Sequence, residues 1–114
     1  MNPTYTEYVI EPWFSHICEG KKTIEGRKNN GRFKTMKEGE TILFKNQDST
    51  KSILTEVVGK RIYPSFKSYL ETETLNKCLP GVKDIIEGEN IYYNFYSIED
   101  ELKYGVVAIE IKSI

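Results

Sequence analysis

The sequence predicts an α+β domain built on a largely antiparallel, partly closed β-barrel that short helices flank. Strand-like alternation and β-branched residues fill most of the first half of the chain and return near its C-terminus, and helical spacing dominates between them. The 114 residues contain no repeat, low-complexity tract or linker, so we expect residues 1–114 to form a single domain. A chain of this length can build one core without disulfides or a structural metal.

The first half is predicted to hold four strands and one helix. The helix covers about 11–19 and ends at Gly20. The polar and basic segment 32–37 follows a turn signal at 29–31, and we expect it to be a loop beside a cleft. Gly59 suits a bulge or a bend in the longest strand. The expected strands are 5–10, 23–28, 40–46 and 52–63.

The second half is predicted to be helical up to a final strand. Ser65, Asp84 and Ser97 are residue types that cap helix N-termini, and each precedes a segment with helical spacing. Gly88 weakens the helix after Asp84 and is expected to divide it in two. The helices therefore begin near 65, 75, 84 and 97, and a β-branched strand over 106–112 closes the sheet.

One polar motif lies where the first helix gives way to a strand. Because side chains alternate along a strand, Thr23, Glu25 and Arg27 share one face, and Ile24 points to the core. Lys22 falls outside this alternation, so it joins Glu25 and Arg27 only if it projects inward from the turn. The residues alone favour an ordinary exposed strand edge with weak ion pairs.

The spacing Gly-x-Lys-x-x-Glu-x-Arg at Gly20, Lys22, Glu25 and Arg27 resembles the signature of the ASCH domain, a branch of the PUA-like superfamily. The resemblance extends over most of the chain. Segment 38–44 is similar to the family's Gly-Asp/Glu strand start, 79–81 to its mid-chain turn and 104–111 to its closing strand.

This resemblance implies a small barrel with a cleft in which the Lys, Glu and Arg of the signature gather. It implies a recognition module for RNA, a nucleotide or a modified nucleoside, with Gly20, Lys22, Glu25 and Arg27 as ligand-binding residues. In this hypothesis Lys22 and Arg27 contact a phosphate or a base edge, and Glu25 orients them or accepts a hydrogen bond from an exocyclic amine.

The alternative hypothesis is an amidohydrolase for N4-acylated cytidine, an activity that the resemblance associates with some small bacterial members. Lys22 would then be the base and Glu25 a second catalytic residue. Those enzymes are expected to carry Thr at the position of Glu25, and this departure favours recognition. Weaker catalytic candidates are Thr23, Glu71 and Glu73.

The low net charge disfavours a protein that holds duplex nucleic acid mainly through its phosphates. The net charge is -1, but residues 1–62 carry +3 and residues 63–114 carry -4. Seven cationic residues between 21 and 37 predict a local basic rim around the motif. Such a rim suits a nucleotide or a short single strand.

No apolar run is long enough to cross a bilayer, and the N-terminus lacks the pattern of a secretory signal, so we expect a cytoplasmic protein. Cys18 and Cys78 form no CxxC pair, and we expect two buried thiols, no metal site and no cofactor. His16, one turn before Gly20, is a secondary candidate at the cleft rim.

Aromatic residues are plentiful, with eight Tyr, five Phe and one Trp. Large rings supply much of the burial in a small domain, so five are expected to pack in the core: Trp13, Phe14, Phe44, Phe66 and Phe95. One or two tyrosines are expected to line the cleft and stack on a base, from the set Tyr92, Tyr93, Tyr96 and Tyr104.

Overall fold

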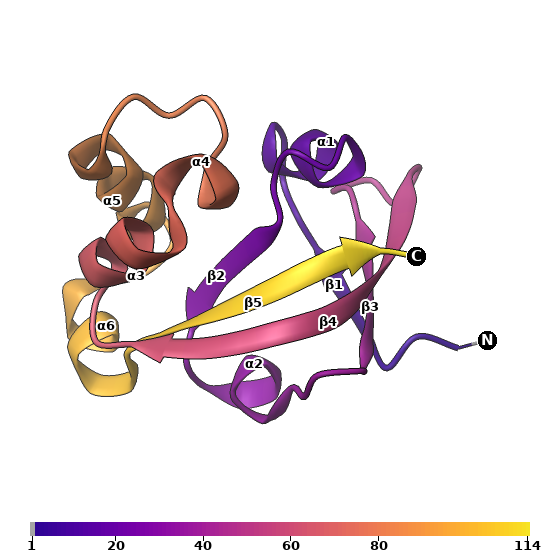
Figure 1. The fold of residues 1–114 in the computed structure, drawn as a ribbon, viewed down its shortest axis with the longest axis horizontal. Helices are drawn as coiled ribbons and strands as arrows, with labels where there is room; N and C mark the ends of the chain where they lie inside the picture. The colour runs from indigo at the N-terminus through magenta and orange to yellow at the C-terminus, as the bar shows by residue number, and fades with distance from the viewer. Residues whose placement is uncertain (1) are drawn as a thin grey trace.

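The computed structural model describes residues 2–114 and consists of a five-stranded mixed sheet curved into a half-barrel with helices around it (Figure 1). The strand order is β1-β3-β4-β5-β2, so that β1 and β2 are the two edges. β1 pairs with β3 in parallel, and the other three pairings are antiparallel. The strands are β1 (Tyr5–Tyr8), β2 (Ile24–Lys28), β3 (Thr41–Lys45), β4 (Ser52–Tyr63) and β5 (Val106–Ser113).

The helices lie in two groups. Figure 1 shows α1 and α2 at opposite ends of the half-barrel, and α3 to α6 together at one side of the sheet. Their bounds are α1 (Trp13–Cys18), α2 (Gly31–Thr35), α3 (Phe66–Glu73), α4 (Leu75–Cys78), α5 (Ile85–Tyr93) and α6 (Ile98–Tyr104). The predicted α+β half-barrel is therefore confirmed.

β5 is buried on both faces, because the molecule has a core on each side of it. Val107, Ile109 and Ile111 pack inside the half-barrel against α1 and α2, whereas Val106 and Ala108 pack against the second helix group. A strand buried on both faces carries apolar residues at consecutive positions, which explains the β-branched run read from the sequence.

Three predicted helix caps and one predicted β-bulge are present in the structure. The side chains of Ser65, Asp84 and Ser97 each accept a hydrogen bond from the backbone N–H three residues later and so cap α3, α5 and α6. The register of β4 against β5 shifts between Val57 and Gly59, so the expected bulge is present.

The prediction of a loop over segment 32–37 is wrong in part, because α2 occupies its first four residues. Two apolar residues, Phe33 and Met36, are buried in the inner core and anchor this helix. The residues around them are polar and only one turn of the helix faces the core, so the sequence shows no helical periodicity here.

Gly88 does not divide α5, which runs unbroken from Ile85 to Tyr93. A Cβ at this position would lie 2.9 Å from Leu70 and 3.1 Å from Leu75. The packing of α5 against α3 and α4 leaves no room for a side chain at residue 88. This tertiary requirement outweighs the low helix propensity of glycine.

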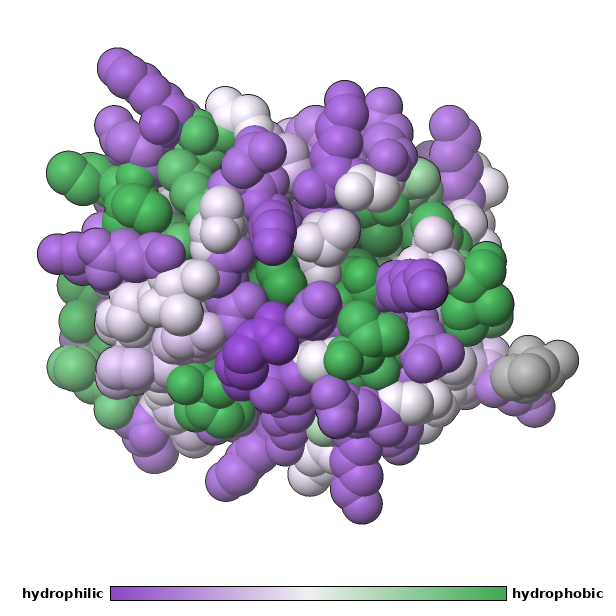
Figure 2. Space-filling view, viewed as in Figure 1, coloured by the Kyte–Doolittle hydropathy of each residue, from purple (hydrophilic) through white to green (hydrophobic). Residues whose placement is uncertain are grey.

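Several large apolar side chains remain exposed on the second helix group. Figure 2 shows hydrophobic residues along the margin of the molecule where Figure 1 places α5 and α6. The most exposed are Ile86, Phe95, Ile98 and Leu102. Within residues 2–114, none of the helices combines the length and the apolar composition needed to span a membrane.

Candidate functional site: a pocket between the two edges of the sheet

The turn after α1 directs the motif toward the interior. The Gly20 N–H donates to the Ile17 carbonyl at 3.1 Å, and the Lys21 N–H donates to the His16 carbonyl at 2.9 Å. These two bonds form a Schellman ending, in which Gly20 has a φ of +76°. Gly20 is exposed and does not line the pocket described below, so its part in the motif is to reverse the chain.

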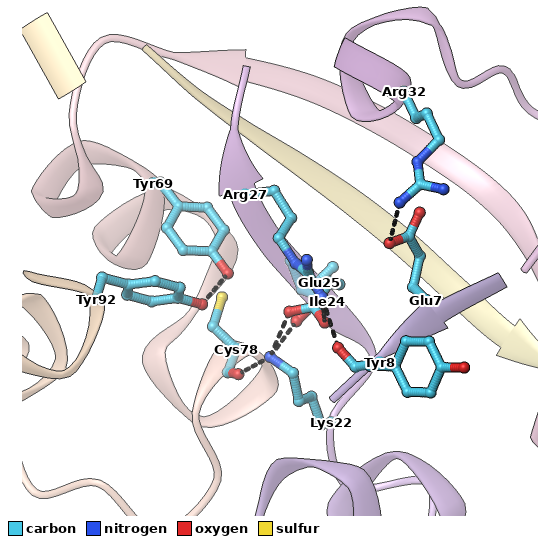
Figure 3. A network of polar contacts seen from close by, with 10 residues as sticks. All are labelled: Glu7, Tyr8, Lys22, Ile24, Glu25, Arg27, Arg32, Tyr69, Cys78 and Tyr92. Carbon is cyan, nitrogen blue, oxygen red and sulfur yellow. Dashed lines mark hydrogen bonds and ion pairs between the residues drawn. The ribbon is translucent and has the colours of Figure 1, made fainter. Parts of the chain in front are cut away.

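Lys22 projects inward from this turn, as the motif required. Its side chain is 2% exposed, and its ammonium group donates hydrogen bonds to the carbonyls of Ile24 (2.8 Å) and Cys78. The Lys22 Nζ lies 3.6 Å from Glu25 Oε1 (Figure 3). Two carbonyls and one carboxylate therefore surround the amino group.

Glu25 and Arg27 lie on the face of β2 that points into the half-barrel. Their paired residues on β5 are Ile109 and Val107, which belong to the inner core. The Arg27 Nη2 lies 3.3 Å from Glu25 Oε2. The guanidinium carbon of Arg27 also stands 4.6 Å from the centre of the Phe33 ring, a cation–π arrangement.

Lys22, Glu25 and Arg27 shift one another's pKa values. Burial raises the pKa of Glu25, but Arg27 and Lys22 together outweigh it and hold that pKa below its usual value. Burial lowers the pKa of Lys22, and Glu25 opposes this effect. Glu25 is therefore a carboxylate at neutral pH.

The cluster forms the polar part of a pocket of about 310 Å³ between the two edges of the sheet. One wall is β2, with Gly26 between Glu25 and Arg27, and the opposite wall is the end of β1 and the residues after it. The remaining walls come from α1, the end of α4, α5 and the turn after α5. The residues that complete the lining are Tyr8, Val9, Ile10, Trp13, Leu79, Ile91, Tyr92, Phe95 and Tyr96.

The aromatic residues of this lining differ in how freely they can meet a ligand. Tyr92 is stacked on Phe66 with ring centres 4.6 Å apart, and its hydroxyl is hydrogen-bonded to the Tyr69 hydroxyl at 2.8 Å. Tyr8 and Phe95 are more than half exposed at the pocket mouth. The expectation that Phe95 packs in the core is wrong, since it stands in a turn with one side open to solvent.

Of the four tyrosines considered from sequence, Tyr92 and Tyr96 line the pocket. Tyr93 instead donates a hydrogen bond to Glu101. The Tyr104 ring makes cation–π contacts with the ammonium groups of Lys28 and Lys103. Trp13 both lines the pocket and packs beside the core, which corrects a purely structural assignment.

A second buried carboxylate lies beside the cluster. Glu7 on β1 faces inward, and its Oε1 accepts a hydrogen bond from Arg32 of α2 at 2.9 Å (Figure 3). Burial, opposed by Arg32 and Arg27, raises the pKa of Glu7. The Arg27 Nη2 also donates to the neighbouring Tyr8 carbonyl at 3.5 Å, so one side chain of β2 reaches the main chain of β1 across the gap between the edges of the sheet.

The weaker catalytic candidates lie away from this lining. Glu71 is exposed on α3, and Thr23 is only half-buried. Glu73 is buried but binds Arg61 through both oxygens, at 2.5 and 2.8 Å, and accepts a hydrogen bond from Tyr63. His16 lies 3.6 Å from Glu19 on α1 and is not part of the lining.

The thiols differ from each other. Cys78 is buried, as expected, and burial raises its pKa to about 11. Cys18 is exposed, contrary to expectation, because α1 turns Phe14 and Ile17 inward and leaves the next position outside. Within residues 2–114, no group of three or more His, Cys, Asp and Glu side chains is arranged to hold a metal ion.

Sequence reasoning missed several lining residues, of which Gly26 is the most informative. A Cβ at Gly26 would lie 2.4 Å from the Tyr69 ring and hydroxyl. Glycine inside a strand often marks a place where another group approaches closely, and this signal was present in the sequence. Val9, Leu79 and Ile91 gave no such signal, since they are ordinary apolar residues that the fold brings to the pocket.

Comparison with known proteins places these features in one family. No curated protein matches this chain. Two solved structures resemble it closely. The hypothetical protein PH0355 is 42% identical, with a TM-score of 0.88 over 96% of this chain and 98% of that one. The protein PF0455 from Pyrococcus furiosus is 37% identical, with a TM-score of 0.78 over 96% of each chain. The ASCH domain model matches residues 8–114, and the chain therefore belongs to the ASCH domain family.

Proposed function

We propose that this protein is an RNA-recognition module that binds one base, or a free nucleoside, in the pocket between β1 and β2. The observation that carries the proposal is the Lys22–Glu25–Arg27 cluster at the polar side of an otherwise apolar and aromatic pocket. A mostly apolar cavity with a few convergent polar groups is the usual form of a small-ligand site. The family context supports a nucleic-acid ligand.

The size and the walls of the pocket suit a flat heterocycle. Its volume of about 310 Å³ lies at the lower end of the range for small-ligand sites, roughly 300–1,000 Å³. Tyr8 and Phe95 provide exposed rings at the mouth. Proteins that read single-stranded RNA stack unpaired bases on such rings.

The cluster suits hydrogen bonding to a base edge. The Lys22 ammonium already serves two carbonyls and a carboxylate, so it mainly fixes the position of Glu25. Glu25 is held at ion-pair distances of 3.3 and 3.6 Å, which leave lone pairs for a further donor. Arg27 has five N–H donors, and the structure occupies them only in part.

The same chemistry favours recognition over amide hydrolysis. Among residues 2–114, the pocket lining contains no Ser, Thr or Cys that could serve as a nucleophile. A carboxylate whose pKa is held low is a weak base for activating water, and the Lys22 ammonium is surrounded by acceptors. These observations support a binding site rather than a hydrolytic one.

The test compares the affinity of the wild type and Arg27→Gln for short single-stranded RNA and for the four ribonucleosides, by isothermal titration calorimetry. Hydrogen bonds to charged groups contribute about 1.5–3 kcal/mol, so Arg27→Gln should weaken binding about tenfold or more. Lys67→Gln, an exposed change on α3 outside the lining, should leave the affinity unchanged.

The proposal is overturned if neither RNA nor any nucleoside binds, or if Arg27→Gln and Lys67→Gln behave alike. N4-acetylcytidine is incubated with the wild type in parallel, and its conversion is followed by chromatography. Turnover that Arg27→Gln abolishes would support the amidohydrolase hypothesis instead.

A further inference from the structure

β2 is an edge strand, so only one of its sides is hydrogen-bonded to the sheet. Ile111 N–H donates to the Thr23 carbonyl at 2.9 Å, and Asn29 N–H donates to the Gly105 carbonyl at 3.0 Å. Both bonds belong to the same continuous antiparallel register between β2 and β5. Hydrogen-bonded and non-hydrogen-bonded pairs alternate in such a ladder, so the odd-numbered residues of β2 bond to β5.

The backbone groups of the even-numbered residues therefore point to the open side. Two contacts agree with this assignment. The Ile24 carbonyl accepts a hydrogen bond from the Lys22 ammonium at 2.8 Å, and the Lys28 carbonyl accepts one from Asn30 N–H at 2.8 Å. Gly26 lies between Ile24 and Lys28, so its N–H and its C=O both point away from β5.

These two groups are buried without a partner from the protein. Gly26 lines the pocket and is among the buried residues. Within residues 2–114, neither its N–H nor its C=O takes part in a hydrogen bond with another backbone group or a side chain. Buried backbone groups are paired in the great majority of cases, so this pair points to a ligand.

Close packing on the other face of β2 explains why residue 26 is a glycine. Its missing side chain would have pointed to the Tyr69 ring, which is fully buried and hydrogen-bonded to Tyr92. The Tyr69–Tyr92 pair thus packs directly against the strand, as Figure 3 shows beside the cluster. The backbone of Gly26 is held between this pair and the pocket.

We propose that the main chain of Gly26 reads the hydrogen-bonding edge of a nucleobase. This inference rests on the proposed function and names its ligand class, which is a base that presents a donor beside an acceptor on one edge. The Gly26 N–H donates to the acceptor of the base, and the Gly26 carbonyl accepts from its donor. Glu25 and Arg27, on either side in sequence, reach the remaining groups.

The pairing of one donor with one acceptor separates this class from other ligands. A phosphate or a carboxylate group offers only acceptors, so it would leave the buried Gly26 carbonyl unpaired. A purely apolar ligand would leave both groups unpaired, at the cost of a buried unsatisfied donor and acceptor. The Watson–Crick edge of every common base carries a donor next to an acceptor.

The experiment follows ¹⁵N-labelled protein by NMR during titration with four nucleosides and their edge-methylated counterparts. The pairs are uridine and 3-methyluridine, cytidine and N4,N4-dimethylcytidine, adenosine and N6,N6-dimethyladenosine, and guanosine and 1-methylguanosine. Each methylation removes an N–H from the edge. The amide of Ile111, whose N–H donates to the Thr23 carbonyl, is the internal control because neither residue lines the pocket.

We expect the Gly26 amide proton to move downfield with the nucleoside that binds best, while the Ile111 amide moves much less. The methylated counterpart should bind up to about tenfold more weakly, which is the loss of affinity expected for one buried hydrogen bond. If a nucleoside binds and Arg27→Gln weakens it, but the Gly26 amide does not shift or methylation has no effect, this inference is wrong and the proposed function stands. If none of the eight nucleosides binds, this inference is wrong, and if short single-stranded RNA does not bind either, the proposed function falls with it.

Discussion

Among the buried glutamates that pair with arginines, Glu73 and Glu25 have sharply different surroundings. Glu73 on α3 binds Arg61 through both oxygens at 2.5 and 2.8 Å and also accepts from Tyr63. Arg61 in turn donates to Glu110 at 2.9 Å. Glu25 on β2 meets Arg27 at 3.3 Å and Lys22 at 3.6 Å, beside an open pocket.

This difference separates a structural ion pair from a binding cluster. The short bidentate geometry at Glu73 uses its lone pairs within the protein and ties α3 to β4. The longer distances at Glu25 leave hydrogen-bonding capacity that faces a cavity. Both pairs consist of a glutamate and an arginine, and only their distances and their neighbours distinguish the two roles.

The largest expected effect tests how deeply the cluster is built into the fold. Lys22→Met leaves Glu25 with one cationic partner and removes the donor to two carbonyls, so it should lower the free energy of unfolding by about 3–5 kcal/mol. Lys21→Met removes an exposed ammonium 3.9 Å from Glu19 and should cost less than about 1 kcal/mol. Urea denaturation measures both. Equal costs would mean that Lys22 is an ordinary surface residue.

A second pair of variants separates the two glutamates by function. Glu73→Gln loses a charge-assisted pair and should lower the free energy of unfolding by about 1.5–3 kcal/mol, without changing RNA affinity. Glu25→Gln should weaken binding of RNA or nucleoside. Calorimetric titration of both variants, with unfolding curves beside them, checks this contrast. Equal losses of affinity would contradict the assignment of Glu73 to structure.

A third variant tests the packing behind the pocket. Gly26→Ala places a methyl group 2.4 Å from Tyr69 and should cost about 1–3 kcal/mol through overpacking. Tyr69→Leu removes the ring atoms and the hydroxyl that the methyl group would meet. The double variant should therefore be more stable than the sum of the single effects predicts, as a double-mutant cycle by urea denaturation would show. Simple additivity would mean that the two residues do not touch.

The smallest expected effect is a pH dependence that concerns the structural pair. The hydrogen bonds from Arg61 hold the pKa of Glu73 below its usual value. A carboxyl group whose folded pKa is depressed stabilises the fold above its unfolded pKa, near 4.3, and this contribution disappears as the pH falls through the folded pKa. The stability difference between wild type and Glu73→Gln should thus shrink below about pH 4.

Glu7 should behave in the opposite sense, because burial raises its pKa. The stability of wild type relative to Glu7→Gln should fall as the pH rises from the unfolded pKa, near 4.3, through the higher folded pKa. Thermal unfolding across this range compares both variants with the wild type. A parallel response of the Glu7 and Glu73 variants to pH would contradict the assigned directions.

Local signals accounted for much of the fold. The caps at Ser65, Asp84 and Ser97 were readable because their side chains bond within one turn of their own helix. The β-branched run of β5 was readable because it is buried on both sides. Helix α2 was missed, since Phe33 and Met36 acquire their burial only from distant strands.

For the candidate site, the sequence by itself determined the spacing of Lys22, Glu25 and Arg27 and the alternation that puts the last two on one face. The turn at Gly20 followed from local hydrogen bonding as well. The tertiary structure alone decided that Lys22 is buried against the Cys78 carbonyl, and that the open side of Gly26 faces a pocket. The physical reason is that periodicity tells which side chains share a face, whereas burial and pairing depend on elements that lie elsewhere in the sequence, such as Cys78 for Lys22.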